Sequence, residues 1–253
     1  MREITISLLH LALQPGLLAA NLALVERGVR TASAAGADWV FAPELCISGY
    51  LFADVIGTGW IAYHPDQWTK YICGLAKSCG VVICFGHAER DRACKFYNSA
   101  FIADPMGAVV GHHRKINTLA ESWASSGRAA EPVTLNGVQV GMLICADAYK
   151  GDVAQVLLLK GAQMLISPAA WAPGLNGPQG EWEQRTVETG LPLIVCNRTG
   201  SEGALTFDGG ESLVIKNGRR LLSHSSRRSA VLTFSWNLES MRPASKEFAA
   251  IYL

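Results

Sequence analysis

Short runs of apolar residues, bounded by glycine, proline and polar residues, recur along the whole chain. Apolar runs of about four to eight residues are typical of buried strands, and apolar positions spaced three to four apart are typical of amphipathic helices. The predicted strands are Ile4 to Leu9, Trp39 to Ala42, Val81 to Phe85, Asn98 to Ala103, Val138 to Ile144, Met164 to Ser167 and Leu193 to Cys196; the predicted helices are Leu18 to Ala35, Gln67 to Ser78, Asp152 to Gly161 and Glu181 to Gly190.

The alternation of strands and helices predicts an α/β architecture. Two stretches, Ser99 to Val110 and Glu211 to Leu222, are typical of hairpins and add antiparallel pairs. We find no fixed-period repeat, no low-complexity tract and no linker with a shift in composition. We therefore expect a layered sandwich that forms a single domain over residues 1–253.

Composition and charge narrow the class of protein. Hydrophobic residues make up 49% of the chain and charged residues 17%, which is typical of an ordinary globular protein. The net charge of +1 gives no field that would attract a polyanion, so we expect no nucleic-acid partner. The N-terminal residues show no cleavage site and no apolar stretch long enough to span a bilayer. We expect a soluble, cytoplasmic protein with no membrane partner.

Seven cysteines are spread over the chain without any paired C-x-x-C spacing: Cys46, Cys73, Cys79, Cys84, Cys94, Cys145 and Cys196. This odd number argues against a disulfide framework, and the spacing argues against a zinc ribbon. Most of these thiols should be small buried hydrophobes in a reducing compartment.

Glu44 follows the predicted strand Trp39 to Ala42 directly, and Pro43 fixes its position. Reactive groups collect where strands of an α/β layer end in loops, because the sheet holds the base of each loop rigid. Glu44 is therefore a candidate for catalysis. A surface or helix-capping glutamate is the alternative.

A second predicted strand end carries His112, His113, Arg114 and Lys115. A solvated basic loop is the plain alternative to a functional role. Adjacent histidines on an extended segment point to opposite faces, which is a poor geometry for a metal site. We expect no metal and no organic cofactor.

The third such position is Cys145, at the end of the predicted strand Val138 to Ile144. A thiol at a turn from a strand toward a helix can lie beside backbone N–H groups, which favour the thiolate and can bind an oxyanion. Buried cysteines at strand ends are also common, and we expect Cys46, Cys84 and Cys196 to be of that inert kind.

The three segments, taken in order, resemble the carbon-nitrogen hydrolase (nitrilase) superfamily. The matching motifs are Pro43-Glu44-Leu45 with Gly49-Tyr50, Arg114-Lys115, and Leu143-Ile144-Cys145-Ala146-Asp147. Further matches extend the resemblance over nearly the whole chain: Tyr97-Asn98-Ser99-Ala100, Gly161-Ala162-Gln163, Ser167-Pro168-Ala169-Ala170-Trp171 and Cys196-Asn197-Arg198-Thr199-Gly200.

The resemblance implies a four-layer α-β-β-α sandwich and a homodimer or higher homo-oligomer. It also implies a second glutamate between the lysine and the cysteine. Glu121 is the better match by its spacing from Gly127, and Glu131 is the reserve. After Cys145 the chain departs from the family, because Gly151, Asp152 and Gln155 stand where Pro-Glu and an arginine are usual. We expect Asp152 to cap the following helix instead.

In the mechanism that the resemblance implies, Glu44 takes the proton of Cys145, whose thiolate attacks a carbonyl carbon. Lys115 and the backbone N–H of Ala146 would stabilise the oxyanion, and Glu121 would hold Lys115 or the substrate amide. Tyr50, Trp171 and Asn197 could line the substrate pocket, with core packing as an equal alternative for Trp171.

Cys145-Ala146-Asp147 favours amidases and carbamoylases over nitrilases, which usually carry Cys-Trp-Glu. We therefore expect hydrolysis of a small linear amide or N-carbamoyl compound, with nitrile hydrolysis as the alternative. Three other classes stay open: a thiol enzyme with a histidine partner, a catalytically silent binding module of the same fold, and a redox sensor that uses Cys145.

Overall fold

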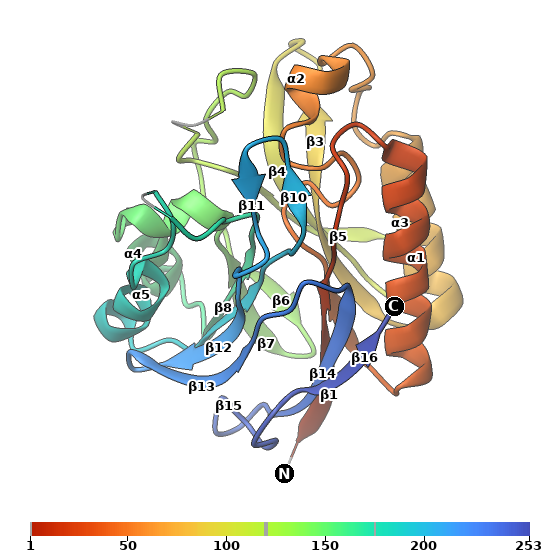
Figure 1. Cartoon of the computed structure of the whole chain (residues 1–253). Coiled ribbons are helices and arrows are strands. Elements are labelled where there is room, and N and C mark those ends of the chain that lie inside the picture. The colour runs from red at the N-terminus through yellow and green to blue at the C-terminus, as the bar shows by residue number, and fades with distance from the viewer. Residues whose placement is uncertain (1, 119–120, 175) are drawn as a thin grey trace.

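Two β-sheets form the centre of the molecule (Figure 1). The computed structural model describes residues 2–118, 121–174 and 176–253. The first sheet has the order β15-β14-β1-β2-β3-β4-β5, with β16 also paired to β14, and the second has the order β13-β12-β9-β8-β7-β6.

The strands of the first sheet are β1 (Glu3–His10), β2 (Trp39–Phe41), β3 (Val82–Arg90), β4 (Phe96–Ala103), β5 (Val109–Arg114), β14 (Ala230–Asn237), β15 (Arg242–Pro243) and β16 (Ala249–Tyr252). Those of the second are β6 (Val133–Leu135), β7 (Val138–Met142), β8 (Met164–Pro168), β9 (Leu193–Cys196), β12 (Ser212–Lys216) and β13 (Arg219–His224). A separate short hairpin joins β10 (Ser201–Glu202) to β11 (Leu205–Thr206).

Helices cover both outer faces of the paired sheets (Figure 1). Helices α1 (Leu18–Ala34) and α3 (Gln67–Cys79) contact β1 and β3 on one side, and α4 (Asp152–Leu159) and α5 (Glu181–Thr189) contact β7 and β12 on the other. Two short helices, α2 (Phe52–Ile56) and the 3-10 helix η1 (Cys145–Tyr149), lie in loops. The predicted four-layer α-β-β-α sandwich is confirmed. No helix among the described residues is both long and apolar enough to span a membrane.

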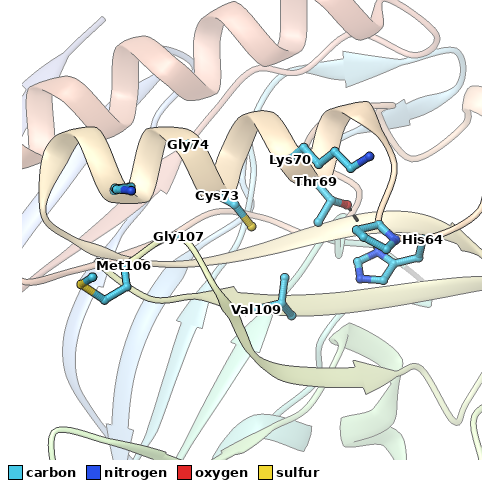
Figure 2. A pocket seen from close by; sticks show the side chains of 10 residues that line it. His64, Thr69, Lys70, Cys73, Gly74, Met106, Gly107 and Val109 are labelled. Atoms are coloured by element: carbon cyan, nitrogen blue, oxygen red, sulfur yellow. Dashed lines mark hydrogen bonds between the residues drawn. The ribbon is translucent and has the colours of Figure 1, made fainter.

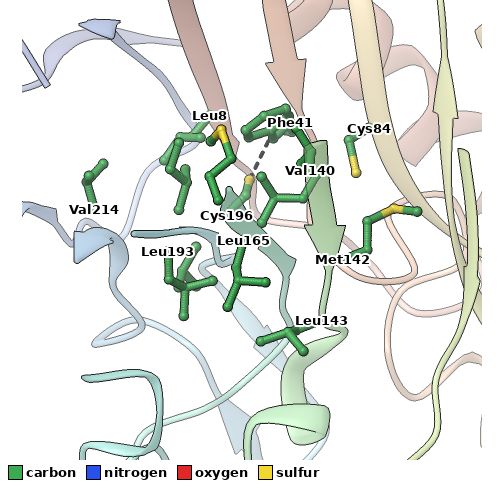
Figure 3. Packing of buried hydrophobic residues seen from close by; sticks show 14 of the residues in the cluster. Leu8, Phe41, Cys84, Val140, Met142, Leu143, Leu165, Leu193, Cys196 and Val214 are labelled. Carbon is green, nitrogen blue, oxygen red and sulfur yellow. Dashed lines mark hydrogen bonds between the residues drawn. The ribbon is translucent and has the colours of Figure 1, made fainter. Parts of the chain in front are cut away.

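The core between the sheets consists of hydrophobic side chains, both aliphatic and aromatic, from both inner faces (Figure 3). Leu8 and Phe41 of the first sheet belong to the same cluster as Leu165 of the second. The Cys196 thiol lies in this layer and donates to the Phe41 carbonyl over 3.1 Å. Burial raises the pKa of Cys196 well above its usual value. This thiol therefore behaves as a small hydrophobe, as predicted.

Two sequence predictions about these elements are wrong in detail, and one long strand was not predicted. Strand β14 was not predicted, yet it pairs with β1 along its whole length, from Glu3 opposite Asn237 to His10 opposite Ala230. The strand predicted to reach Ile144 ends at Met142, because the chain turns there toward η1. Asp152 is the first residue of α4 and not its cap, since Gly151 occupies the N-cap position.

Candidate active site

The ends of β2, β5 and β7 bring Glu44, Lys115 and Cys145 into one buried cluster, although two of these strands lie in the first sheet and one in the second. Lys115 Nζ donates to Glu44 Oε1 over 2.6 Å. The Cys145 thiol donates a hydrogen bond to the same carboxylate. The three strand ends that the sequence singled out therefore meet.

Glu44 accepts hydrogen bonds on both carboxylate oxygens. Besides Lys115, Asn98 Nδ2 donates to Oε1 over 2.8 Å, and the Ala170 N–H donates to Oε2 over 2.9 Å. A Cβ at Gly86 would lie 2.6 Å from Glu44 Cα, so only glycine allows β3 to approach this closely. The carboxylate is thus held from three directions, which fixes its orientation toward Cys145.

Lys115 lies between two carboxylates, those of Glu44 and Glu121, and its side chain is almost completely buried. Burial alone would lower the pKa of Lys115, but the negative charges of Glu44 and Glu121 outweigh it and raise this pKa well above its usual value. Lys115 is therefore a permanent cation at the bottom of the site.

The structure brings Glu121 to Lys115 and keeps Glu131 away. Glu121 accepts from Lys115 and, over 2.9 Å, from Asn98 Nδ2, so a single amide group links both carboxylates of the site. Burial and the neighbouring Glu44 raise the pKa of Glu121. Glu131 pairs with Lys160 at the surface, where 64% of its side chain is exposed.

Cys145 begins η1 with a φ of 44°, in the left-handed region that a non-glycine residue rarely adopts. Such a strained residue is kept only where its surroundings hold it in place. Only 4% of Cys145 is exposed. Burial and the negative charge of Glu44 raise the pKa of the thiol well above its usual value, although Lys115 and the Ala170 N–H act in the opposite direction. The resting thiol therefore keeps its proton beside a carboxylate that can accept it.

Asp147 connects the segment of Cys145 to the segment of Lys115. Its Oδ1 accepts from the N–H groups of Ile116 and Asn117, both over 2.9 Å. Its Oδ2 accepts from the Ile144 N–H over 3.0 Å and pairs with His113 Nε2 over 2.8 Å. The sequence contained Asp147 as part of a motif but gave no sign of these bonds.

The side chain of the neighbouring His112 points away from that of His113, and its Nε2 pairs with Glu89 over 2.8 Å. The two rings therefore serve different partners, as expected for adjacent residues on an extended strand. Within the part of the chain that the structure describes, no group of three or more His, Cys, Asp and Glu residues is arranged to hold a metal ion.

Two of the predicted pocket residues lie beside the reactive groups. The ring centroid of Tyr50, which is half-buried, is 6.0 Å from Lys115 Nζ. Ala146 is the second residue of η1, and the Asp147 N–H makes the bond to the Ile144 carbonyl that opens this helix. The backbone N–H of Ala146 thus has no acceptor within η1, since the first N–H groups of any helix lack one.

The other two predicted pocket residues are packed into the interior. The Trp171 ring lies 4.7 Å from that of Tyr149 and 4.9 Å from that of Trp182. Asn197 is 0% exposed, and its amide exchanges hydrogen bonds of 3.0 Å with the backbone N–H and carbonyl of Trp171. These contacts join the ends of β8 and β9, and for Trp171 they match the core-packing alternative.

Three contributors to the site were given no role at the sequence level: Asn98 and Ala170, which stand in matching motifs, and Tyr149. Asn98 and the adjacent Ser99 are polar residues in a buried strand of mostly apolar residues, and this was an available signal. Ala170 contributes through its backbone, which no side-chain pattern reveals. Burial, followed by the nearby Cys145, raises the pKa of Tyr149, whose hydroxyl donates to the Asn176 carbonyl over 2.8 Å.

A groove of about 510 Å³ lies on the outer face of the molecule, between α3 and the hairpin of β4 and β5 (Figure 2). His64, Thr69, Cys73, Met106 and Val109 are among its lining residues. None of the residues that we place around Cys145 lines it. The groove is therefore separate from the candidate active site.

Comparisons with known proteins show which family the chain belongs to. Residues 6–246 match the sequence model of the carbon-nitrogen hydrolase family. The chain is 30% identical over 213 residues to a nitrilase of Pyrococcus abyssi, covering 81% of this chain and 79% of that one. It is 27% identical over 231 residues to an omega-amidase of Danio rerio, covering 84% and 80%.

A solved structure with the same fold is an amidase from Nesterenkonia sp. AN1 that carries acrylamide on its active-site cysteine. Its TM-score is 0.83 at 24% identity, and the match covers 91% of this chain and 92% of that one. A likeness at this identity concerns the fold alone. The family match over nearly the whole sequence leads to one conclusion: this chain belongs to the carbon-nitrogen hydrolase family.

Proposed function

We propose that this chain hydrolyses the C–N bond of a small linear amide or N-carbamoyl compound through an acyl thioester on Cys145. The observation that carries this proposal is the buried contact of one thiol, one carboxylate and one ammonium in Cys145, Glu44 and Lys115. A nucleophile, a base and a cation for the oxyanion are the groups that acyl transfer requires.

In the first step Glu44 accepts the proton of the Cys145 thiol, and the sulfur forms a bond to the carbonyl carbon of the amide. The carbonyl π electrons move to the oxygen, which becomes an oxyanion. The Lys115 ammonium and the Ala146 N–H stabilise that charge, and preorganised donors of this kind each contribute about 3 kcal/mol to catalysis. The ammonium is suited to this task because it is buried and permanently charged.

In the second step the tetrahedral adduct collapses, the C–N bond breaks, and protonated Glu44 donates its proton to the departing nitrogen. Ammonia or an amine leaves, and the acyl group remains on sulfur. A water molecule that gives a proton to Glu44 then attacks the thioester and releases the carboxylic acid. The thiol recovers its proton from Glu44, so the sum is amide plus water giving acid plus ammonia or amine.

We assign Glu121 to holding Lys115 in place, and this role is supported by their direct ion pair and by the bridging amide of Asn98. Tyr50 is our candidate for a wall of the substrate pocket, because its ring lies near Lys115. For Asn197 and Trp171 we propose a supporting role in place of substrate contact, since both are buried among backbone and ring partners.

Nitrile hydrolysis by the same residues is the second candidate. It is favoured by the 30% identity to a protein named as a nitrilase. The omega-amidase and amidase relatives, together with the sequence Cys145-Ala146-Asp147, favour the amide. A catalytically silent binding module is the remaining alternative, and the experiment below tests it.

The test is an ammonia-release screen over short amides, N-carbamoyl compounds and nitriles, with the Cys145→Ala variant beside the wild type. We expect release from amides or carbamoyl compounds by the wild type only, and an acyl adduct on Cys145 by intact mass. Cys94→Ala is the matched control, because Cys94 is an exposed free thiol outside the cluster. Release from nitriles alone would support the second candidate, and silence across the panel would refute an enzymatic role.

We further propose that the protein works in the cytoplasm as a homodimer or higher homo-oligomer. The compartment is supported by the seven cysteines, all of which are free thiols. The oligomer rests on the family resemblance. Light scattering after size-exclusion chromatography tests the assembly, and a purely monomeric species at micromolar concentration would contradict it.

A further inference from the structure

Asp147 is a buried, charged motif residue beside this site that the proposed reaction does not use. It is buried, and its carboxylate accepts hydrogen bonds on both sides of the cluster. Ile116 and Asn117, which it binds through their N–H groups, directly follow Lys115. Ile144, the third N–H donor, directly precedes Cys145. The Asp147 carboxylate thus joins the backbone segment that follows Lys115 to the backbone segment that precedes Cys145.

His113 completes the arrangement from β5, the strand that ends at Lys115. Its Nε2 lies 2.8 Å from Asp147 Oδ2, with both side chains buried. Burial alone would raise the pKa of Asp147, but the hydrogen bond and charge of His113, together with the Asn117 and Ile144 N–H groups, hold it below its usual value. Asp147 therefore stays a carboxylate, which can accept from all of these donors at once.

The turn that Asp147 holds is the one with the unfavourable backbone. Cys145 has a positive φ, and the Ile144 N–H bond to Asp147 Oδ2 closes the turn around it. A second tie joins the same two segments, because Asn117 Nδ2 donates to the Ala146 carbonyl over 2.9 Å. The position of the Cys145 sulfur relative to the Lys115 ammonium thus depends on bonds between these two turns.

We propose that Asp147, oriented by His113, is a positioning residue that sets the placement of the Cys145 sulfur and the Ala146 N–H relative to the Lys115 ammonium. This inference rests on the proposed function for its catalytic meaning. The effect on the thiol does not depend on the substrate. Without Asp147, Lys115 stabilises the Cys145 thiolate less, and Cys145 reacts more slowly with any electrophile at a given pH.

The test compares Asp147→Asn with Asp66→Asn. Asp66 forms an equivalent buried pair with His87, also at 2.8 Å, but it caps α3 and does not touch the cluster. An amide at position 147 presents one oxygen and one NH2 group, so it cannot accept from Ile144 and from the Lys115 side together. An amide at position 66 still caps the helix.

Two readouts separate positioning from general stability. The rate of Cys145 alkylation by iodoacetamide is followed by mass spectrometry from pH 6 to 10, and kcat and KM are measured on the amide found in the screen. We expect Asp147→Asn to slow alkylation about tenfold near neutral pH and to move its midpoint upward. We expect kcat to fall about 10- to 100-fold, with KM within about threefold.

Asp66→Asn should lower the melting temperature comparably and leave the alkylation profile and kcat unchanged. An Asp147→Asn protein that alkylates as the wild type does would overturn the positioning role, even if amide turnover were established. A wild type that turns over no amide would refute the proposed function, while the alkylation profiles still decide the positioning. If Asp147→Asn fails to fold, His113→Leu and His113→Gln replace it, and only His113→Gln, which keeps a donor, should retain the wild-type profile.

Discussion

The Lys115 ammonium donates a 2.6 Å hydrogen bond to Glu44, a residue 71 positions away along the chain, in a place where both side chains are buried. The two residues end different strands of the same sheet. In the proposed mechanism, the proton that Glu44 takes from Cys145 cancels the charge of this carboxylate. The ammonium is then less compensated at the moment when the oxyanion forms, so its attraction for that oxyanion is greatest then.

Glu44→Gln should remove the base and keep the shape of the side chain. We expect kcat to fall by about 10²- to 10⁴-fold with little change in KM, since general base catalysis contributes about this much. Lys115 and the Ala170 N–H both donate to the Glu44 carboxylate. In the variant one of these donors would face the NH2 group of the glutamine, so the melting temperature should also fall. Steady-state kinetics and a melting curve measure both effects, and near-wild-type kcat would contradict the role of Glu44.

Lys115→Met should be strongly destabilising, because it leaves the carboxylates of Glu44 and Glu121 buried without their cation. Removal of one partner of a buried pair costs about 3–5 kcal/mol. Lys160→Met is the matched control, since Lys160 pairs with the exposed Glu131, and it should cost less than about 1 kcal/mol.

The cost of Lys115→Met should depend on pH. The pKa of Glu121 is already raised by burial and by Glu44, and loss of the lysine raises it further. A carboxyl with a raised pKa in the folded state favours folding at low pH and loses that contribution as the pH rises. Urea unfolding at pH 5 and pH 8 should therefore show a smaller defect at pH 5, and a defect independent of pH would argue against buried, uncompensated carboxylates.

Gly86→Ala should damage the site without altering any reactive group. The new Cβ would lie 2.6 Å from both Glu44 Cα and the Leu45 backbone nitrogen, so the strand end that carries Glu44 has to move. We expect a lower melting temperature and a loss of kcat of about 100-fold or more, as misplacements of about 1 Å produce.

Gly74→Ala is the control for that substitution. Gly74 lies within α3, and a Cβ there meets no atom within 4 Å. Because alanine favours helix over glycine, this variant should gain about 0.5–1 kcal/mol in stability and keep its activity. Equal damage from both substitutions would show that the close contact at Gly86 is not the cause.

His10 should make the fold sensitive to mild acid. Burial, followed by the neighbouring His224, lowers the pKa of His10 from 6.5 to about 4. Above pH 6.5 His10 is neutral in both the folded and the unfolded chain. Between pH 6.5 and about pH 4 it binds a proton in the unfolded chain but not in the folded one. The free energy of unfolding therefore falls as the pH falls through this window. The loss at pH 5 should be about 2 kcal/mol.

His10→Gln should remove this loss, as measured by urea unfolding at pH 7 and pH 5. Burial also lowers the pKa of His224, but that ring is only partly buried, so His224→Gln should have the smaller effect. The same acid sensitivity in His10→Gln and in the wild type would contradict this assignment.

The sequence by itself determined the α/β class and the three strand ends with Glu44, Lys115 and Cys145. The fold class and the three candidate residues follow from local information. Hydrophobic periodicity indicates burial along one segment, and a reactive residue next to an apolar run is recognised from that segment alone. Strand β14 was missed although buried and partly exposed residues alternate along its second half, which is a local signal; only its pairing with β1, at the other end of the chain, lies beyond local information.

Only the tertiary structure decided which groups surround these residues. Along the chain Glu121 is the better match for the second glutamate and Glu131 the reserve, but only the structure shows that Glu121 reaches Lys115 and Glu131 does not. The bonds of Asp147 to the Lys115 segment, the shared amide of Asn98 and the N–H of Ala170 all join segments distant in sequence. Hydrogen bonds between such segments depend on how the two sheets pack, and no pattern within one segment contains that information.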